Sequence, residues 1–133
     1  MTAANLPDSL RLQLVSPAQV RAGEAVPIAL RLENVGPRPM ELYLRGRTIA
    51  FDVTVTRPAG DTLWQRLHDA IIPAIIQLRV LAPGEALVLE HEWDQRDNGG
   101  APVGPGEYVV RGSILTDAPA PWASAPAPLR IVP

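Results

Sequence analysis

Apolar and polar residues alternate along most of this chain, and Pro or Gly interrupts the alternation roughly every eight to twelve residues through its middle. A period of two places successive side chains on opposite faces of an extended strand, whereas an amphipathic helix needs apolar residues three and four positions apart. Fifteen Pro and ten Gly residues leave too little uninterrupted sequence for long helices. The chain is therefore predicted to be all-β.

The alternation divides the chain into eight or nine short strands, at residues 9–16, 26–33, 40–45, 51–56, 62–67, 77–81, 86–93, 107–116 and 129–132. The strand at 51–56 gives the clearest pattern, because β-branched residues occupy both of its faces. The turn-forming run at 34–39 predicts that the strand at 40–45 lies antiparallel to the strand at 26–33. Asn34, which begins this run, is expected to bond neighbouring backbone groups through its side chain.

Two stretches are predicted to lie outside the strands. Pro17 and Gly23 bound a loop, and the Pro/Ala-rich segment 117–128, which carries Trp122, forms a loosely structured excursion. Strands of this length and spacing occur most often in two packed antiparallel sheets with immunoglobulin-like connections. The predicted fold is therefore an immunoglobulin-like antiparallel β-sandwich of about eight strands, formed as one domain by residues 1–133.

A Pro-Gly-Glu turn occurs twice, at 83–85 and 105–107, and each copy leads into an apolar strand. Pro fixes φ near −65° and Gly frees the next position to reverse the chain. The repeat predicts that the two following strands share one layer, with the turns as corners of the sandwich. Trp93 lies between the turns, and Tyr108 follows the second one, where a tyrosine corner would tie its hydroxyl to nearby backbone.

Composition excludes several classes of protein. The chain has no cysteine, so disulfides, thiolate metal sites and a cysteine nucleophile are absent. The net charge is −2, and the twelve basic residues, all Arg, are scattered rather than clustered, which argues against nucleic-acid binding. The first residues lack the basic and apolar regions of a signal peptide, and no window approaches the roughly eighteen apolar residues of a membrane span. We therefore expect a cytoplasmic protein.

The sequence contains few residues in an arrangement suited to catalysis or metal binding. His91 lies between Glu90 and Glu92, but strand alternation directs these carboxylates away from it, so a packed, hydrogen-bonded His is expected rather than a base or metal ligand. His68 and Asp69 are expected to form a solvated pair. Acidic residues near 94–98 resemble part of a calcium loop, yet the bidentate Glu that such a loop needs is replaced by Pro105. Neither an enzyme nor a cofactor is predicted.

Two segments are candidates for contact with a partner. The run 67–76 holds four Ile residues without polar alternation and is broken by Pro73. It is either a loop folded over the open end of the core or an exposed apolar ridge, and the covering loop is favoured because large exposed apolar patches are rare on soluble monomers. The run 94–103 is polar and Gly-rich and is predicted to be a surface loop with a turn at Asn98-Gly99.

The order of these features resembles the BsuPI-type intracellular proteinase inhibitor family of bacteria. The resemblance covers about residues 30–114. It rests on Asn34 at a strand end and on a set of turn and core positions, namely Phe51, Trp64, Pro83, Gly84, Trp93, Pro105, Gly106 and Tyr108. The motifs are moderately specific as a set and weak singly.

This resemblance implies an immunoglobulin-like β-sandwich inside the cell that binds and inhibits an intracellular serine protease without covalent chemistry. It brings no catalytic residue and no inhibitory loop. The partner-binding residues that we expect come from the two candidate segments and are Ile71, Ile72, Pro73, Asp94, Arg96, Asp97 and Asn98. The alternative is an immunoglobulin-like interaction module with another protein partner and no inhibitory activity; the sequence does not indicate the oligomeric state.

Overall fold

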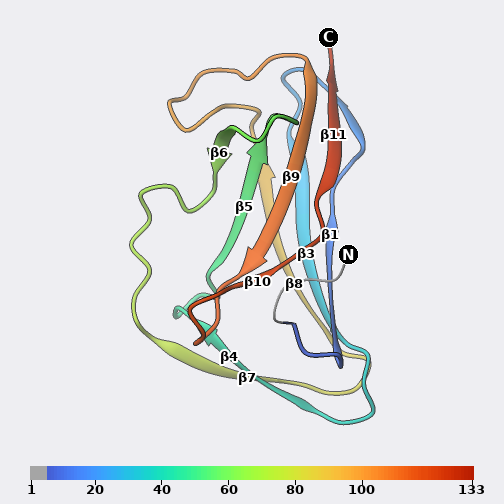
Figure 1. Ribbon diagram of the computed structural model, residues 1–133, viewed down its shortest axis with the longest axis vertical. Helices are drawn as coiled ribbons and strands as arrows, with labels where there is room; N and C mark the ends of the chain where they lie inside the picture. The colour runs from blue at the N-terminus through green and yellow to red at the C-terminus, as the bar shows by residue number, and fades with distance from the viewer. Residues whose placement is uncertain (1–5) are drawn as a thin grey trace.

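The computed structural model describes residues 6–133, and every regular element in that part of the chain is a β-strand (Figure 1). The strands are β1 (Leu10–Val15), β2 (Gln19–Arg21), β3 (Val26–Asn34), β4 (Met40–Arg45), β5 (Phe51–Thr56), β6 (Thr62–Gln65), β7 (Ile76–Leu81), β8 (Ala86–Trp93), β9 (Gly106–Ile114), β10 (Trp122–Ala123) and β11 (Ala127–Val132). The predicted all-β sandwich is confirmed.

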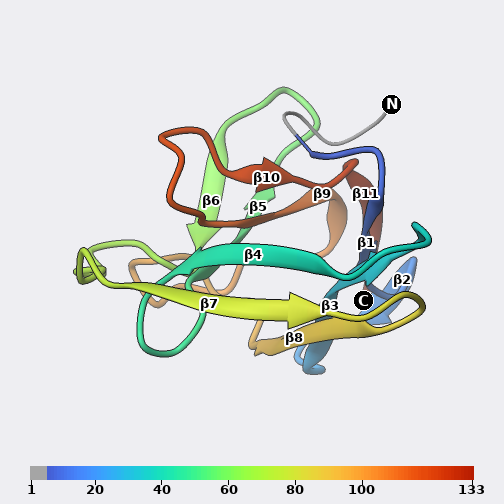
Figure 2. The same cartoon turned by 90° about the horizontal axis from the view of Figure 1, so that it is seen from below.

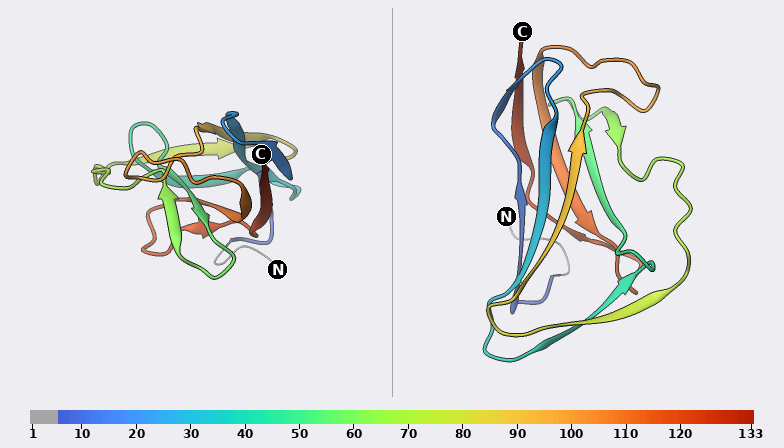
Figure 3. Two further views of the ribbon diagram at one scale, coloured as in Figure 1. Left: turned by 90° about the horizontal axis from the view of Figure 1, so that it is seen from above. Right: turned by 180° about the vertical axis from the view of Figure 1, so that it is seen from behind.

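Two sheets face each other and enclose the core. One has the order β1-β3-β8, and the other has the order β2-β11-β9-β5-β6, with β10 paired to β9. The two layers are seen one in front of the other in the right-hand view of Figure 3. The sheets approach so closely that a Cβ added at Gly112 in β9 would lie 2.5 Å from Cδ2 of Leu30 in β3. This contact explains why a glycine occupies a buried strand position.

A third sheet of only two strands, β4 and β7, crosses the lower end of the sandwich, and we call it the end sheet (Figure 2). Its inner side chains Leu42, Leu44 and Leu81 are all at least 98% buried and join the core. Beyond β4, Arg45 N donates to Leu115 O at 3.2 Å and Asp117 N donates to Tyr43 O at 3.1 Å. The end sheet therefore closes one end of the core.

Residues 40–45, predicted to lie antiparallel to residues 26–33, do not pair with them. β3 pairs with β1 and β8, whereas β4 pairs with β7. The turn between β3 and β4 changes the direction of the chain, as its sequence indicates, but the core offers β4 a better place across the open end. Turn residues predict that a chain changes direction, but they do not predict which sheet the next strand joins.

Two short strands replace regions predicted as irregular. β2 lies within the loop predicted between Pro17 and Gly23 and pairs in parallel with β11, while β10, with Trp122, pairs with β9 inside the predicted excursion. At three and two residues, neither strand is long enough to show a period of two. Both form because an existing strand edge offers them backbone partners.

The two Pro-Gly-Glu turns do not lead into one layer, so that prediction is wrong. β8 follows the first turn and lies in the three-stranded sheet, while β9 follows the second and lies in the facing sheet. The first is a closed turn, in which Glu85 N donates to Ala82 O at 2.9 Å and Gly84 has φ of 82°. The second leads into the tyrosine corner, where the Tyr108 hydroxyl lies 2.7 Å from the carbonyl oxygens of Val103 and Gly104.

Asn34, at the end of β3, is fully buried and joins three parts of the chain. Its Nδ2 donates to Arg38 O at 2.7 Å and to Leu81 O at 2.9 Å, and its Oδ1 accepts from Gly36 N at 2.9 Å. Its backbone bonds the first Pro-Gly-Glu turn, since Gly84 N donates to Asn34 O at 2.8 Å. The expected local backbone bonds are present, and they extend to the end of β7.

We predict that Asn34→Ala lowers the free energy of unfolding by about 3 kcal/mol, because it removes three side-chain hydrogen bonds and leaves buried carbonyl groups without partners. Urea unfolding followed by tryptophan fluorescence measures the loss. Val35→Ala is the control, since the Val35 side chain is 51% exposed and its truncation should change stability by less than about 0.5 kcal/mol. Equal stability of the two variants would contradict the role of Asn34.

Candidate protein-binding surface

The Ile-rich loop, residues 66–75 between β6 and β7, is an exposed ridge rather than a cover for the core. The Ile71 side chain is 94% exposed and that of Ile75 is 36% exposed. Ile72 is half-buried, and Pro73 is exposed. The loop runs along the outside of the molecule in Figure 1, because the end sheet already closes the end of the core that this loop could have covered. The favoured alternative, a loop folded over the core, is therefore wrong, and the exposed ridge is the one observed.

Both ends of the Ile-rich loop are held in place. At its start, the Arg66 guanidinium lies 3.8 Å from the centre of the Phe51 ring and donates to Phe51 O at 2.7 Å. Leu67 N donates to Asp52 Oδ1 at 3.0 Å. Just beyond its end, Gln77 Nε2 donates to Gly46 O at 2.7 Å. The exposed isoleucines are thus presented between two fixed anchors.

The polar loop, residues 94–103 between β8 and β9, uses most of its polar atoms to hold itself together. Asp97 Oδ1 accepts from Gly99 N and Ala101 N, both at 2.9 Å, and Gly100 N donates to Asp97 O at 3.0 Å. The predicted turn at Asn98-Gly99 is confirmed by this bond. The Asp97 carboxylate thus accepts hydrogen bonds from the backbone of the turn whose sequence resembled a calcium loop. The described residues contain no cluster of three or more potential metal ligands.

Asn98 attaches the polar loop to the edge of β6. Its Oδ1 accepts from Gln65 N at 2.8 Å, its Nδ2 donates to Gln65 O at 3.0 Å, and its backbone N donates to Leu63 O at 3.3 Å. These bonds occupy backbone groups that an edge strand would otherwise expose. Asp94 and Arg96 are exposed on the same loop. Asp94 and Arg96 also bond within the loop, since Arg96 N donates to Asp94 Oδ1 at 3.1 Å and the Arg96 guanidinium donates to Gly100 O at 2.8 Å. All four polar-loop residues expected to bind a partner therefore help to hold the loop, and Asp94, Arg96 and Asn98 are also exposed.

The structure brings the two candidate segments together only where each lies against β6. His68, Asn98 and Gln65 line one shallow cavity, while Ile72 and Pro73 line another with Arg66 and Ala50. His68 Nε2 lies 3.3 Å from Asp69 Oδ2, and both side chains are exposed, so the expected solvated pair is present. The candidate residues form a discontinuous surface along one side of the molecule and not a single cluster.

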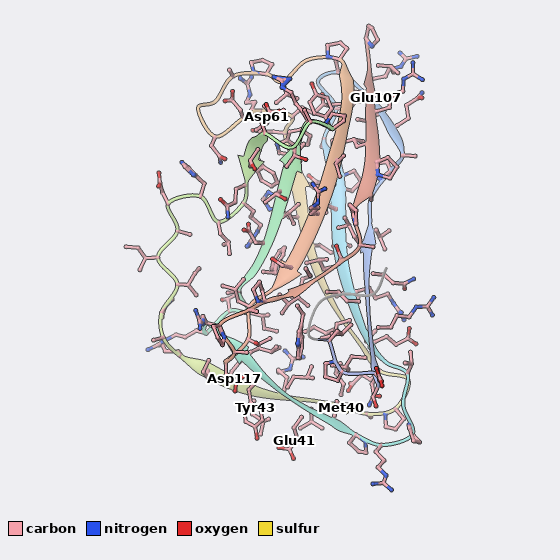
Figure 4. All side chains as sticks on the ribbon, viewed as in Figure 1. Met40, Glu41, Tyr43, Asp61, Glu107 and Asp117 are labelled. Carbon is pink, nitrogen blue, oxygen red and sulfur yellow. The ribbon has the colours of Figure 1, made fainter. Side chains whose placement is uncertain are left out.

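The outer face of the end sheet exposes apolar side chains that are not among the residues expected to bind a partner. Tyr43, Ile76, Leu78 and Val80 are between 42% and 53% exposed. In Figure 4, Glu41 and Tyr43 point away from the body of the molecule. The Tyr43 hydroxyl donates to Glu41 Oε2 at 3.2 Å, and this bond raises the pKa of Tyr43. The sequence does show alternate apolar residues at 76, 78 and 80, but the same pattern occurs when that face of a strand is buried, so it does not predict an exposed face.

His91 packs within an aromatic group between the facing sheets. Its ring stacks on Trp64 of β6 with centroids 5.4 Å apart and planes 18° apart, and Trp64 also contacts Trp93 at 5.7 Å. Glu90 and Glu92 lie on the exposed face of β8, as expected. The packed His is confirmed, but the expected hydrogen bond of its side chain is not seen among the described residues, and its contact is aromatic stacking instead. Burial, and secondarily the charge of Arg66, lowers the pKa of His91.

The sequence matches the model of a known protein family. A model described as BsuPI, intracellular proteinase inhibitor, matches residues 14–119, which extends the resemblance of residues 30–114 at both ends. It describes a family of inhibitors rather than enzymes, so the expectation that the chain is not an enzyme is confirmed. No curated protein matches the sequence. Among the described residues, no helix is long and apolar enough to cross a membrane.

Solved structures with a similar fold have low sequence identity. AlkC, an alkylpurine DNA glycosylase from Pseudomonas fluorescens bound to DNA with an abasic site analogue, has a TM-score of 0.52 and 17% identity. A mutant β-glucosidase from Listeria innocua in complex with laminaribiose has a TM-score of 0.50 and 10% identity. The alignments cover 98% and 93% of this chain but only 32% and 16% of those proteins, so the likeness concerns the fold alone. A CARDB domain from Pyrococcus furiosus aligns over 93% of this chain and 94% of its own, with 13% identity and a TM-score of 0.45.

The lowered pKa of His91 predicts that stability decreases on acidification. The folded state binds a proton at His91 less readily than the unfolded chain does, so the free energy of unfolding falls as pH drops below about 6.5. His91→Phe keeps an aromatic ring against Trp64 and removes the titrating group, so part of this decrease should disappear. Urea midpoints at pH 7.5 and 5.5 measure it.

His68→Gln is the matched control, because His68 is exposed on the Ile-rich loop. It should keep the full pH dependence of the wild type. If His91→Phe and His68→Gln change the pH dependence equally, the stack at His91 is not its source.

Proposed function

Because this chain belongs to the BsuPI family of intracellular proteinase inhibitors, we propose that it inhibits a serine protease of the same cell by non-covalent binding. The family match is the observation that carries this proposal. We place the activity in the cytoplasm and assign it to residues 1–133 as one immunoglobulin-like domain. Inhibition then consists of occluding the active site, for which a surface of about 800 Å² on each partner is typical.

The Ile-rich loop supports this proposal by its exposure and its anchoring. A side chain such as Ile71, 94% exposed and apolar, gains from transfer into a pocket of the protease. Its loop is fixed near both ends by Arg66 and Gln77, so that binding loses less conformational entropy than it would with a free loop. In this proposal Ile71, Ile72 and Pro73 contact the protease directly.

The polar loop has a divided role in the same proposal. Asp94 and Arg96 supply exposed charges at the rim of the contact, where charges influence association rate and selectivity. Asp97 and Asn98 affect binding indirectly by fixing the conformation of the loop, because their side chains bond Gly99, Ala101 and Gln65. Replacing either of them would alter how the rim charges are presented.

We predict that the purified protein inhibits at least one member of a panel of subtilisin-type proteases from the same cell. Ile71→Asp should raise the inhibition constant roughly tenfold or more, because the contact would bury a carboxylate without a partner. Val35→Asp, at a 51% exposed position between β3 and β4, is the matched control and should leave inhibition unchanged. Steady-state inhibition assays measure both variants.

Full protease activity at micromolar inhibitor across the whole panel would contradict the proposed function. Capture of a stable partner that is not a protease would instead favour an interaction module. Equal inhibition by Ile71→Asp and the wild type would remove the Ile-rich loop from the contact and leave the inhibition itself intact.

A further inference from the structure

β7 has one hydrogen-bonded edge and one free edge. Gly46 N donates to Ile75 O at 2.7 Å, and the register continues through Leu44 opposite Gln77 and Leu42 opposite Arg79. In an antiparallel pair, alternate residues direct their N–H and C=O groups to the partner. The odd-numbered residues of β7 therefore bond β4, and Ile76, Leu78 and Val80 direct theirs outward. Within residues 6–133, no other strand pairs with this edge.

This free edge lacks most of the features that usually prevent strands from pairing with other chains. Those features are Pro, inward-pointing charges, a bulge or a covering loop. Of these, β7 has only one charge on its inner face, Arg79, which lies opposite Leu42 and whose side chain is exposed. β7 reads Ile-Gln-Leu-Arg-Val-Leu and pairs in regular register with β4. The edge of β6, by contrast, is covered by Asn98, which bonds Gln65 on both sides. Asn98 thus covers the edge of β6, whereas β7, like β1 and β8, ends its sheet with an edge that no strand within residues 6–133 pairs with.

The strand is also held rigidly from its inner side. The Leu81 side chain is 98% buried, and Leu81 O accepts from the buried Asn34 Nδ2. At the other end, Gln77 Nε2 donates to Gly46 O and Arg47 O at 2.7 and 2.8 Å. An extended segment that is fixed in advance loses little entropy when a second strand pairs with it.

We propose that β7 is the segment through which this inhibitor binds its protease, by pairing its free edge with an extended strand at the protease's active-site cleft. The inference rests on the proposed function. Proteases hold substrates as extended chains, with backbone hydrogen bonds along one edge and alternate side chains in pockets. β7 has the same properties: outward backbone groups at Ile76, Leu78 and Val80, and their exposed apolar side chains on one face. It follows the Ile-rich loop directly in the chain.

Two substitutions at Leu78 separate the backbone contact from the side-chain contact. Leu78→Pro removes an N–H that faces the free edge and keeps the bonds of Gln77 and Arg79 to β4, since Pro is tolerated on strand edges. Leu78→Lys keeps the N–H and places a charge on the apolar face. Each should raise the inhibition constant at least tenfold. Val88→Lys, at a 46% exposed site on β8, is the control and should inhibit as the wild type does.

Hydrogen exchange of the wild-type protein gives a readout that does not depend on any variant's folding. The amides of Ile76, Leu78 and Val80 should exchange rapidly in the free protein and be protected in the complex with the inhibited protease. Protection that grows with inhibitor concentration in the absence of protease would show pairing with a second copy and would overturn the proposal. So would unchanged exchange at these amides in the complex, or wild-type inhibition by both Leu78 variants.

The two proposals fail in different ways. If the wild type inhibits no protease, the proposed function fails and the assignment of β7 fails with it. If the wild type inhibits a protease and the amides of β7 stay unprotected in the complex, the inhibitor function stands and only the assignment of β7 is overturned.

Discussion

The hydrogen bonds of Asn34 determine where the end sheet lies. Its amide joins the turn after β3 to the last residue of β7, through Arg38 O and Leu81 O, and its own backbone bonds the turn that begins β8. A buried amide with all of these partners fixes three chain segments relative to one another. β4 is thereby directed away from β3, and β7 is held across the lower end of the core.

The exposed surface follows from that position. Leu42, Leu44 and Leu81 fill the end of the core from the inner face of the end sheet. Since no space remains there, the Ile-rich loop lies outside, and the outer face of β7 has nothing packed on it. Burial on one face of this sheet and exposure on the other are therefore two results of the same packing. Natural proteins seldom expose apolar residues in such a continuous run, and when they do the run is commonly an interaction site.

Much of the fold was predictable because it depends on local patterns. The long strands, the inward residues of β8 and β9 and the tyrosine corner at Tyr108 follow from a period of two and from Pro-Gly turns. The pairing of β4 and the short strands β2 and β10 could not be predicted in this way, since each depends on a distant partner. The candidate site was harder to predict, because an apolar run such as 71–76 has the same sequence whether it is buried or exposed.

Residue spacing and turn chemistry suffice to predict that the chain forms β-strands, where they turn, and which family it resembles. That β8 and β9 lie in opposite sheets and that Asp97 and Asn98 brace the polar loop follows instead from how the strands pack. The free apolar edge of β7 follows from the same packing. The physical reason is that burial and hydrogen-bond satisfaction are properties of the whole fold: Ile71 and Leu42 are similar apolar residues, and only packing makes one exposed and the other buried.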